Sequence, residues 1–174
     1  MMPLLRHHQM PLALVKLMPC IALTVVLSTI GCRPFGGTAA QSRENLPAGF
    51  IEVVSDQIRW EPNRTVPGGQ TTVLIGDPSK AGLLVLRARV PANARLAPHL
   101  HPEPRTYTVL SGEWKLGFGT QFDPKLLRSY PAGSVFRLPA GVPHFQATGL
   151  METVIQIESI GPTATEYIGA KPQP

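Results

Sequence analysis

Three histidines are the side chains of this sequence best suited to chemistry. Five histidines occur among the 174 residues, and two of them lie near the N-terminus. The rest of the chain holds only His99, His101 and His144. His99 and His101 are separated by one residue, which on a β-strand turns both imidazoles to the same face. Because imidazole binds zinc, iron, copper and nickel, the three side chains form a candidate metal site.

The chain offers little for other kinds of catalysis. Both cysteines, Cys20 and Cys32, precede the part of the chain expected to fold, so that part has no thiolate nucleophile and no disulfide. With the three histidines committed to a metal, none is left for a Ser-His-Asp triad, and no phosphate-binding glycine loop is present. We therefore expect one divalent transition metal as the cofactor, with iron, zinc, copper, nickel and manganese all open.

Residues 1–32 have the layout of an export leader. Arg6 and Lys16 precede an apolar run at 17–30, and no acidic residue occurs in residues 1–32. The run is shorter than the roughly 20 residues that cross a bilayer and contains a proline, which disfavours a permanent transmembrane anchor. We expect an exported protein of the periplasm or cell envelope.

Two cleavage sites fit this leader. Cys32 follows Gly31 at the end of the apolar run, and this resembles the lipobox of bacterial lipoproteins, in which the cysteine is acylated and becomes the mature N-terminus. Signal-peptide cleavage after Ala40 is the alternative, because small residues precede that bond. In either case we expect membrane contact only through the leader or the lipid.

Composition indicates an all-β domain. Nineteen prolines and sixteen glycines are typical of many short strands joined by turns, and the length suits one domain. Of the net charge of +5, Arg6 and Lys16 contribute two, and the remaining basic residues are scattered with no basic run or aromatic-basic ladder. Nucleic-acid binding is therefore not expected.

The order of apolar runs and turn residues divides the chain after the leader at 1–32 into three parts. Residues 33–49 are small and polar and are predicted to be a linker. Residues 50–160 are predicted to form a sandwich or barrel, and residues 161–174 a C-terminal tail. The predicted strands are 50–54, 71–75, 83–90, 106–110, 114–117, 134–138, 145–148 and 153–158, with one helical turn at 122–127.

The two histidine segments resemble the paired motifs of the cupin superfamily, G-x5-H-x-H-x3,4-E-x6-G and G-x5-P-x-G-x2-H-x3-N. At the family spacing, the first motif is matched by Asn93, His99, His101, Arg105 and Gly112, and the second by Gly133, Pro139, Gly141, His144 and Thr148. Asn93 replaces a glycine, and asparagine tolerates the same left-handed turn. The resemblance implies a single-domain, type-2-like bacterial cupin with a jelly-roll β-barrel. It also implies a metal on the three histidines and a small-molecule ligand. A homodimer is one of the assembly states that the sequence leaves open.

Arg105 departs from the family pattern, because it occupies the position of the glutamate ligand. Arginine has no lone pair to give and repels a dication. Glu103 is a further candidate ligand, and since prolines flank it on both sides the strand can bend there, so Glu103 could bind the metal, pair with Arg105 or face solvent.

Two residues are candidates for binding a substrate. Arg105 could hold a carboxylate beside the metal, or could be an outward surface charge. Tyr107 could line a pocket at the mouth of the barrel, or belong to the core.

Two classes of function remain open. An enzyme would use the metal to polarise a small molecule or bind dioxygen, as an oxygenase, isomerase or hydrolase. A binding module would capture a small ligand or metal as a sensor or scavenger, and the loss of the glutamate ligand favours it.

Acylation at Cys32 has a direct test. If the cysteine carries lipid, the protein will fractionate with membranes, and Cys32→Ala will release it to the soluble fraction because the anchor is lost. The measurement is an immunoblot of membrane and soluble fractions, and unchanged fractionation of the variant would contradict lipidation.

Overall fold

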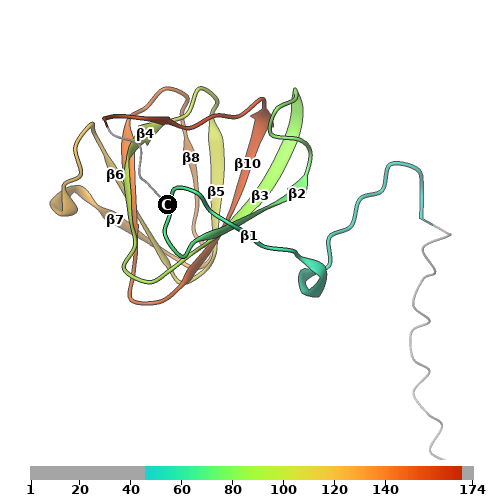
Figure 1. Cartoon of the computed structure of the whole chain (residues 1–174), viewed down its shortest axis with the longest axis horizontal. Helices are drawn as coiled ribbons and strands as arrows, with labels where there is room; N and C mark the ends of the chain where they lie inside the picture. Colours follow the sequence, from blue (N-terminus) through green and yellow to red (C-terminus); the bar gives the residue numbers. More distant parts are fainter. Residues whose placement is uncertain (1–45, 170–174) are drawn as a thin grey trace, which may run out of the picture. The chain divides into compact units, whose positions relative to one another are not determined.

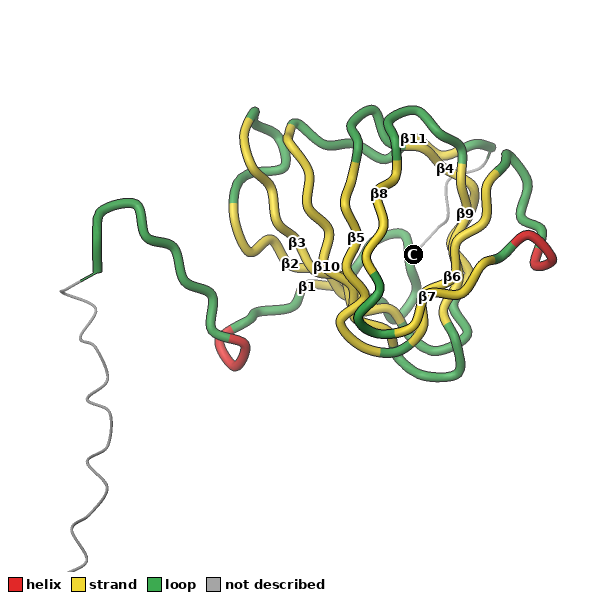
Figure 2. Tube along the Cα trace, turned by 180° about the vertical axis from the view of Figure 1, so that it is seen from behind, coloured by secondary structure: helices red, strands yellow, loops and turns green. Residues whose placement is uncertain are grey.

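Two antiparallel β-sheets face each other in the computed structural model of the protein, which describes residues 46–169 (Figures 1 and 2). One sheet has the order β1-β2-β3-β10-β5-β8 and the other the order β11-β4-β9-β6-β7. The strands are β1 (Glu61–Pro62), β2 (Gln70–Ile75), β3 (Gly82–Val90), β4 (Arg95–Leu100), β5 (Arg105–Ser111), β6 (Glu113–Phe118), β7 (Arg128–Pro131), β8 (Val135–Leu138), β9 (His144–Thr148), β10 (Thr153–Gly161) and β11 (Glu166–Tyr167). Two 3-10 turns, η2 (Ser55–Gln57) and η3 (Pro124–Leu126), complete the elements.

The all-β prediction is confirmed, and each strand predicted from residue 71 onward overlaps an observed one. The predicted helical turn is η3, which Asp123 caps by accepting a hydrogen bond from the Lys125 backbone N–H (2.9 Å). No predicted range covers β4, although a strand was expected at His99 and His101, and the short strands β1, β7 and β11 were not predicted either. These three short strands share two features. Each lies at or next to a sheet edge and is defined by its pairing rather than by an alternating pattern of its own.

The predicted strand at 50–54 is wrong. This segment has no regular secondary structure and pairs with no strand of the described chain, and β1 forms the edge of its sheet instead. Its side chains are exposed, with Phe50 at 52% and Ile51 at 58%. A β-branched run becomes a strand only when a neighbouring backbone offers a ladder, and none is present here.

The core lies between the two sheets and follows from strand alternation. Along β10, Thr153, Ile155 and Ile157 are buried while the residues between them are half-exposed. β10 pairs with β3 over its full length and with β5 on its other side, so it is the centre of the larger sheet. The buried cluster comprises Val66, Ala88, Val90, Tyr107, Val109, Trp114, Leu138, Ile155 and Ile157.

The turns that carry the family motifs have the conformations that the motifs require. Asn93 has a φ of +56°, so it does take the left-handed conformation expected of an asparagine at a glycine position. Thr148, at the end of the second motif, holds the same turn, since its hydroxyl donates to the Pro91 carbonyl (2.6 Å) and accepts from the Ala94 N–H (2.9 Å). The threonine thereby joins β9 to the connection between β3 and β4.

The segment after β10 packs against the barrel. β11 pairs with β4, with Tyr167 opposite His99, and the Thr163 N–H donates to the Pro78 carbonyl (2.8 Å). Residues 161–169, predicted as part of a tail, therefore reach the strand that carries His99. The predicted leader, with Cys32 and both cleavage sites, lies outside the described residues, and within 46–169 there is no helix long and apolar enough to cross a membrane.

Candidate metal centre

The register of two strands brings the histidines together. β4 and β9 pair so that His99 stands opposite His144, and His101 follows directly after the end of β4. The ring centroids are 4.3 Å apart for His99 and His144, 4.9 Å for His99 and His101, and 5.1 Å for His101 and His144. One ligand nitrogen from each ring lies within 4.8 Å of the other two, and all three residues are buried.

Backbone hydrogen bonds determine the tautomer of each ring. The Nδ1 of His99 lies 2.7 Å from the Ala97 carbonyl, and the Nδ1 of His144 lies 2.9 Å from the Val142 carbonyl. The Nδ1 of His101 lies 2.9 Å from the carbonyl of Ala164, in the segment after β10. A carbonyl can only accept, so each Nδ1 donates its proton and each neutral ring keeps its lone pair on Nε2.

These rings fit a metal ion. The Nε2 of His144 is buried and has no hydrogen-bond partner, which leaves a lone pair unsatisfied within the protein. A backbone carbonyl on the opposite nitrogen is the usual means by which proteins orient a ligating histidine. The donor set of three neutral imidazoles suits a divalent transition metal.

Burial keeps the three imidazoles neutral in the metal-free protein. Desolvation, with the positive charge of Arg105 as the next cause, lowers the pKa of His101 to about 2. Desolvation, followed by the charge of His99, lowers the pKa of His144 to about 4. The pKa of His99 is lowered as well, mainly by burial and against the hydrogen bond to Ala97.

Arg105 and Glu103 form a buried ion pair. The Glu103 carboxylate lies 2.7 Å from both Nε and Nη2 of Arg105, and the two side chains are each only 9% exposed. The sequence left three roles open for Glu103, and in the structure it pairs with Arg105. Its carboxylate does not join the group formed by the three histidines. The outward-facing alternative for Arg105 is also excluded.

The ion pair holds the segment after β10 over the site. Arg105 Nη2 donates to the Ala164 carbonyl (2.8 Å) and to the Thr163 hydroxyl, and that hydroxyl also bonds Glu103. The same Ala164 carbonyl accepts from His101. Arg105 therefore helps to orient His101 through the backbone of residue 164.

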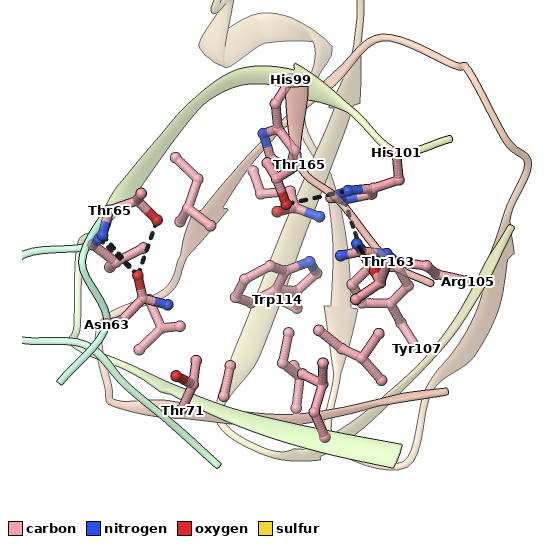
Figure 3. Close-up of a pocket in the computed structure, with 18 of the residues that line it drawn as sticks. Asn63, Thr65, Thr71, His99, His101, Arg105, Tyr107, Trp114, Thr163 and Thr165 are labelled. Carbon is pink, nitrogen blue, oxygen red and sulfur yellow. Dashed lines mark hydrogen bonds between the residues drawn. The ribbon is translucent and has the colours of Figure 1, made fainter. Parts of the chain in front are cut away.

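A cavity of about 310 Å³ lies beside the histidines within the barrel (Figure 3). Arg105 and Tyr107 both line it, and the Tyr107 hydroxyl lies 3.4 Å from Nε2 of His101. Tyr107 also belongs to the core, so both roles considered for it are realised. Burial raises the pKa of its hydroxyl, which keeps it protonated.

Sequence reasoning missed several residues of this cavity. Gln146 lies two residues after His144 on β9, so strand alternation alone would have placed it on the same inward face. Trp114, in the strand predicted at 114–117, belongs to the core and lines the cavity too. Thr163, Ala164 and Thr165 carry no sequence signal, because they reach the site only through the fold of the chain after β10.

Comparison with known proteins gives the family. The family model described as Cupin matches residues 67–171, which is more than half of the chain, and the chain belongs to the cupin family. The prediction from the two motifs is thus confirmed. A search of curated protein sequences finds no match.

Solved structures agree on the fold. The polyketide cyclase RemF from Streptomyces resistomycificus is 17% identical, with a TM-score of 0.59 over 72% of this chain and 89% of RemF. KdgF from Halomonas sp. is 18% identical, with a TM-score of 0.50 over 66% of this chain and 96% of KdgF. A salicylate 1,2-dioxygenase from Pseudaminobacter salicylatoxidans is 18% identical, with a TM-score of 0.51 over 64% of this chain and 33% of the dioxygenase.

The ion pair predicts a non-additive effect of substitution on stability. Arg105→Met leaves the Glu103 carboxylate buried without its cation, and we expect it to lower the free energy of unfolding by about 3–5 kcal/mol. Glu103→Leu combined with Arg105→Met removes both charges and should recover most of that loss. Urea unfolding of the metal-free protein measures both. Lys80→Met, which breaks the exposed pair with Asp77, is the control and should change little. Additive effects of the two buried substitutions would contradict the coupling.

The lowered pKa values predict that the metal-free protein loses stability in mild acid. In the unfolded chain the three histidines take up protons below about pH 6.5, whereas in the folded protein they resist protonation to lower pH. The free energy of unfolding should fall as the pH falls from 6.5 toward 4, by up to about 1.4 kcal/mol per pH unit for each imidazole. Urea unfolding at pH 7.5, 6 and 5 measures the slope. The triple variant His99→Gln, His101→Gln, His144→Gln should give a flatter profile, and an equal slope in both proteins would contradict the assignment.

Proposed function

We propose that this cupin is an exported protein that holds one divalent transition metal ion on His99, His101 and His144 and receives a small molecule in the adjoining cavity. The observation that carries the proposal is the set of three Nδ1 hydrogen bonds to backbone carbonyls, which place the proton of each ring on Nδ1 and its lone pair on Nε2, the nitrogen that would coordinate. Export is supported by the leader pattern of residues 1–32.

The residues around the metal would divide the work as follows. A divalent ion on the three rings supplies Lewis acidity that polarises an oxygen atom of a bound molecule. Tyr107, kept protonated by burial, can donate a hydrogen bond next to His101. The Arg105–Glu103 pair holds opposite charges against each other, which reduces the repulsion that a lone arginine would exert on a dication.

The chemistry of the cavity favours some reactions over others. Among the described residues, no aspartate or glutamate lines it. An isomerase that moves protons needs a general base, and the histidines cannot serve while they bind metal. We therefore favour a metal-dependent oxygenase among the enzymatic possibilities.

A non-catalytic sensor or scavenger is the second candidate. The observation in its favour is that Glu103, the carboxylate nearest in sequence to the histidines, has its Oε1 engaged by Arg105 and Thr163 and does not join the histidine group. Oxygen uptake by the metal-loaded protein over a panel of small aromatic and enolisable carboxylates separates the two candidates, since a binding module would bind without consuming oxygen.

Metal content tests the proposal directly. The purified wild-type protein should carry about one divalent transition metal ion per chain, and His99→Ala or His144→Ala should lower the affinity at least tenfold because a ligand is lost. Elemental analysis after dialysis measures the content, and the near-ultraviolet circular dichroism of the buried tryptophan checks folding. Gln156→Ala, on the outer face of β10, is the control and should keep the metal. A wild-type protein that stays metal-free after exposure to these ions would overturn the proposal.

A further inference from the structure

Two buried hydrogen-bond donors in the cavity have no partner. The Nε1 of Trp114 and the Nε2 of Gln146 make no hydrogen bond, although the two residues are only 1% and 2% exposed. Both residues line the cavity beside the histidines. A buried donor without an acceptor is unfavourable, so a fold keeps one only where something else compensates.

The register of β6 and β9 places these two donors near each other and near the metal ligands. Gln146 follows His144 by two residues on β9, so their side chains share the inward face. Leu116 pairs with Gln146 and Trp114 pairs with Thr148, which makes Trp114 and Gln146 diagonal neighbours on that face. Figure 3 shows the indole of Trp114 within the cavity, with its nitrogen edge turned to the side where His101 lies.

Tyr107 adds a third polar group at the same end of the cavity. Its hydroxyl lies 3.4 Å from Nε2 of His101. Gln146 and Tyr107 both line the cavity, and the Gln146 amide nitrogen makes no hydrogen bond there. An indole N–H can only donate, so a ligand group that satisfies the hydrogen-bonding capacity of Trp114 must be an acceptor.

The rest of the cavity determines the body of the ligand. Its other walls are mainly aliphatic and include Leu86, Val90, Leu96, Ile155 and Ile157. The described part of the lining holds no carboxylate that would repel an anion. A molecule that suits both ends has an oxygen-rich, negatively charged head and a compact apolar body.

We propose that Trp114 and Gln146 form an acceptor-binding pair that receives the carboxylate of a small organic acid with a compact apolar body, beside the three histidines. This assignment rests on the proposed function only in taking the cavity as the ligand site. The two residues thereby set specificity for acids over neutral or cationic molecules of the same shape.

Calorimetric titration with benzoate tests whether Trp114 and Gln146 bind a carboxylate. Benzylamine is the comparison ligand, because it has the same ring but carries an ammonium group that can only donate hydrogen bonds. Wild-type protein should bind benzoate and not benzylamine, both with metal and after metal removal. Trp114→Phe and Gln146→Leu should each weaken benzoate binding about tenfold or more, because each removes one donor from a buried anion. The matched controls Trp60→Phe and Gln156→Leu, which alter the same residue types outside the cavity, should bind benzoate as the wild type does.

A second readout separates a binding role from a structural one. Because Gln146 lacks a partner, Gln146→Leu should leave the unfolding midpoint of the ligand-free protein equal or higher while benzoate no longer raises it. Metal content should stay at the wild-type level in both cavity variants. Benzoate binding that is absent from the wild type, or equally tight in Trp114→Phe and Gln146→Leu, would overturn the assignment. A wild type that takes up no metal ion when exposed to one, yet binds benzoate through Trp114 and Gln146, would overturn the metal proposal and leave this assignment standing.

Discussion

The pairing of β4 with β9 sets His99 opposite His144, and the remainder of the site is arranged around that pair. Each of these two rings donates to the carbonyl two residues before it, at Ala97 and Val142, so its orientation is set within its own strand or turn. The Nδ1 of His101 instead donates to the carbonyl of Ala164, which lies more than sixty residues away in the sequence. Two ligands are therefore oriented locally and the third by tertiary structure.

Arg105 shows how a substitution at a ligand position can be absorbed by the fold. An unpaired arginine next to three metal-binding rings would oppose a dication, but Glu103 lies close enough to pair with it, and both charges are buried together. At the position where the cupin motif has a glutamate, this chain has a side chain that holds the segment after β10. The result is a candidate metal centre of three neutral imidazoles, facing a cavity with hydrogen-bond donors at one end.

The parts of the fold and site that could be predicted are those carried by local patterns. The spacing of His99 and His101, the left-handed Asn93 and the alternation along β10 each follow from a few consecutive residues. The strand proposed for 50–54 failed because a strand needs a partner, which no local pattern supplies. The position of Glu103 stayed open because Pro102 and Pro104 permit several backbone paths, and only the packing of Thr163 and Ala164 selects one.

The position of Thr163 and Ala164 in the sequence also has a consequence for how the site is assembled. These residues follow β1 to β10 in the sequence, and they complete both the orientation of His101 and the contacts of Arg105. A ribosome or export channel that releases the chain from its N-terminus therefore delivers the last part of the site after nearly all of the barrel. For the metal ion proposed above, the three rings therefore reach their final orientation only after residues 163 and 164 have packed against the barrel.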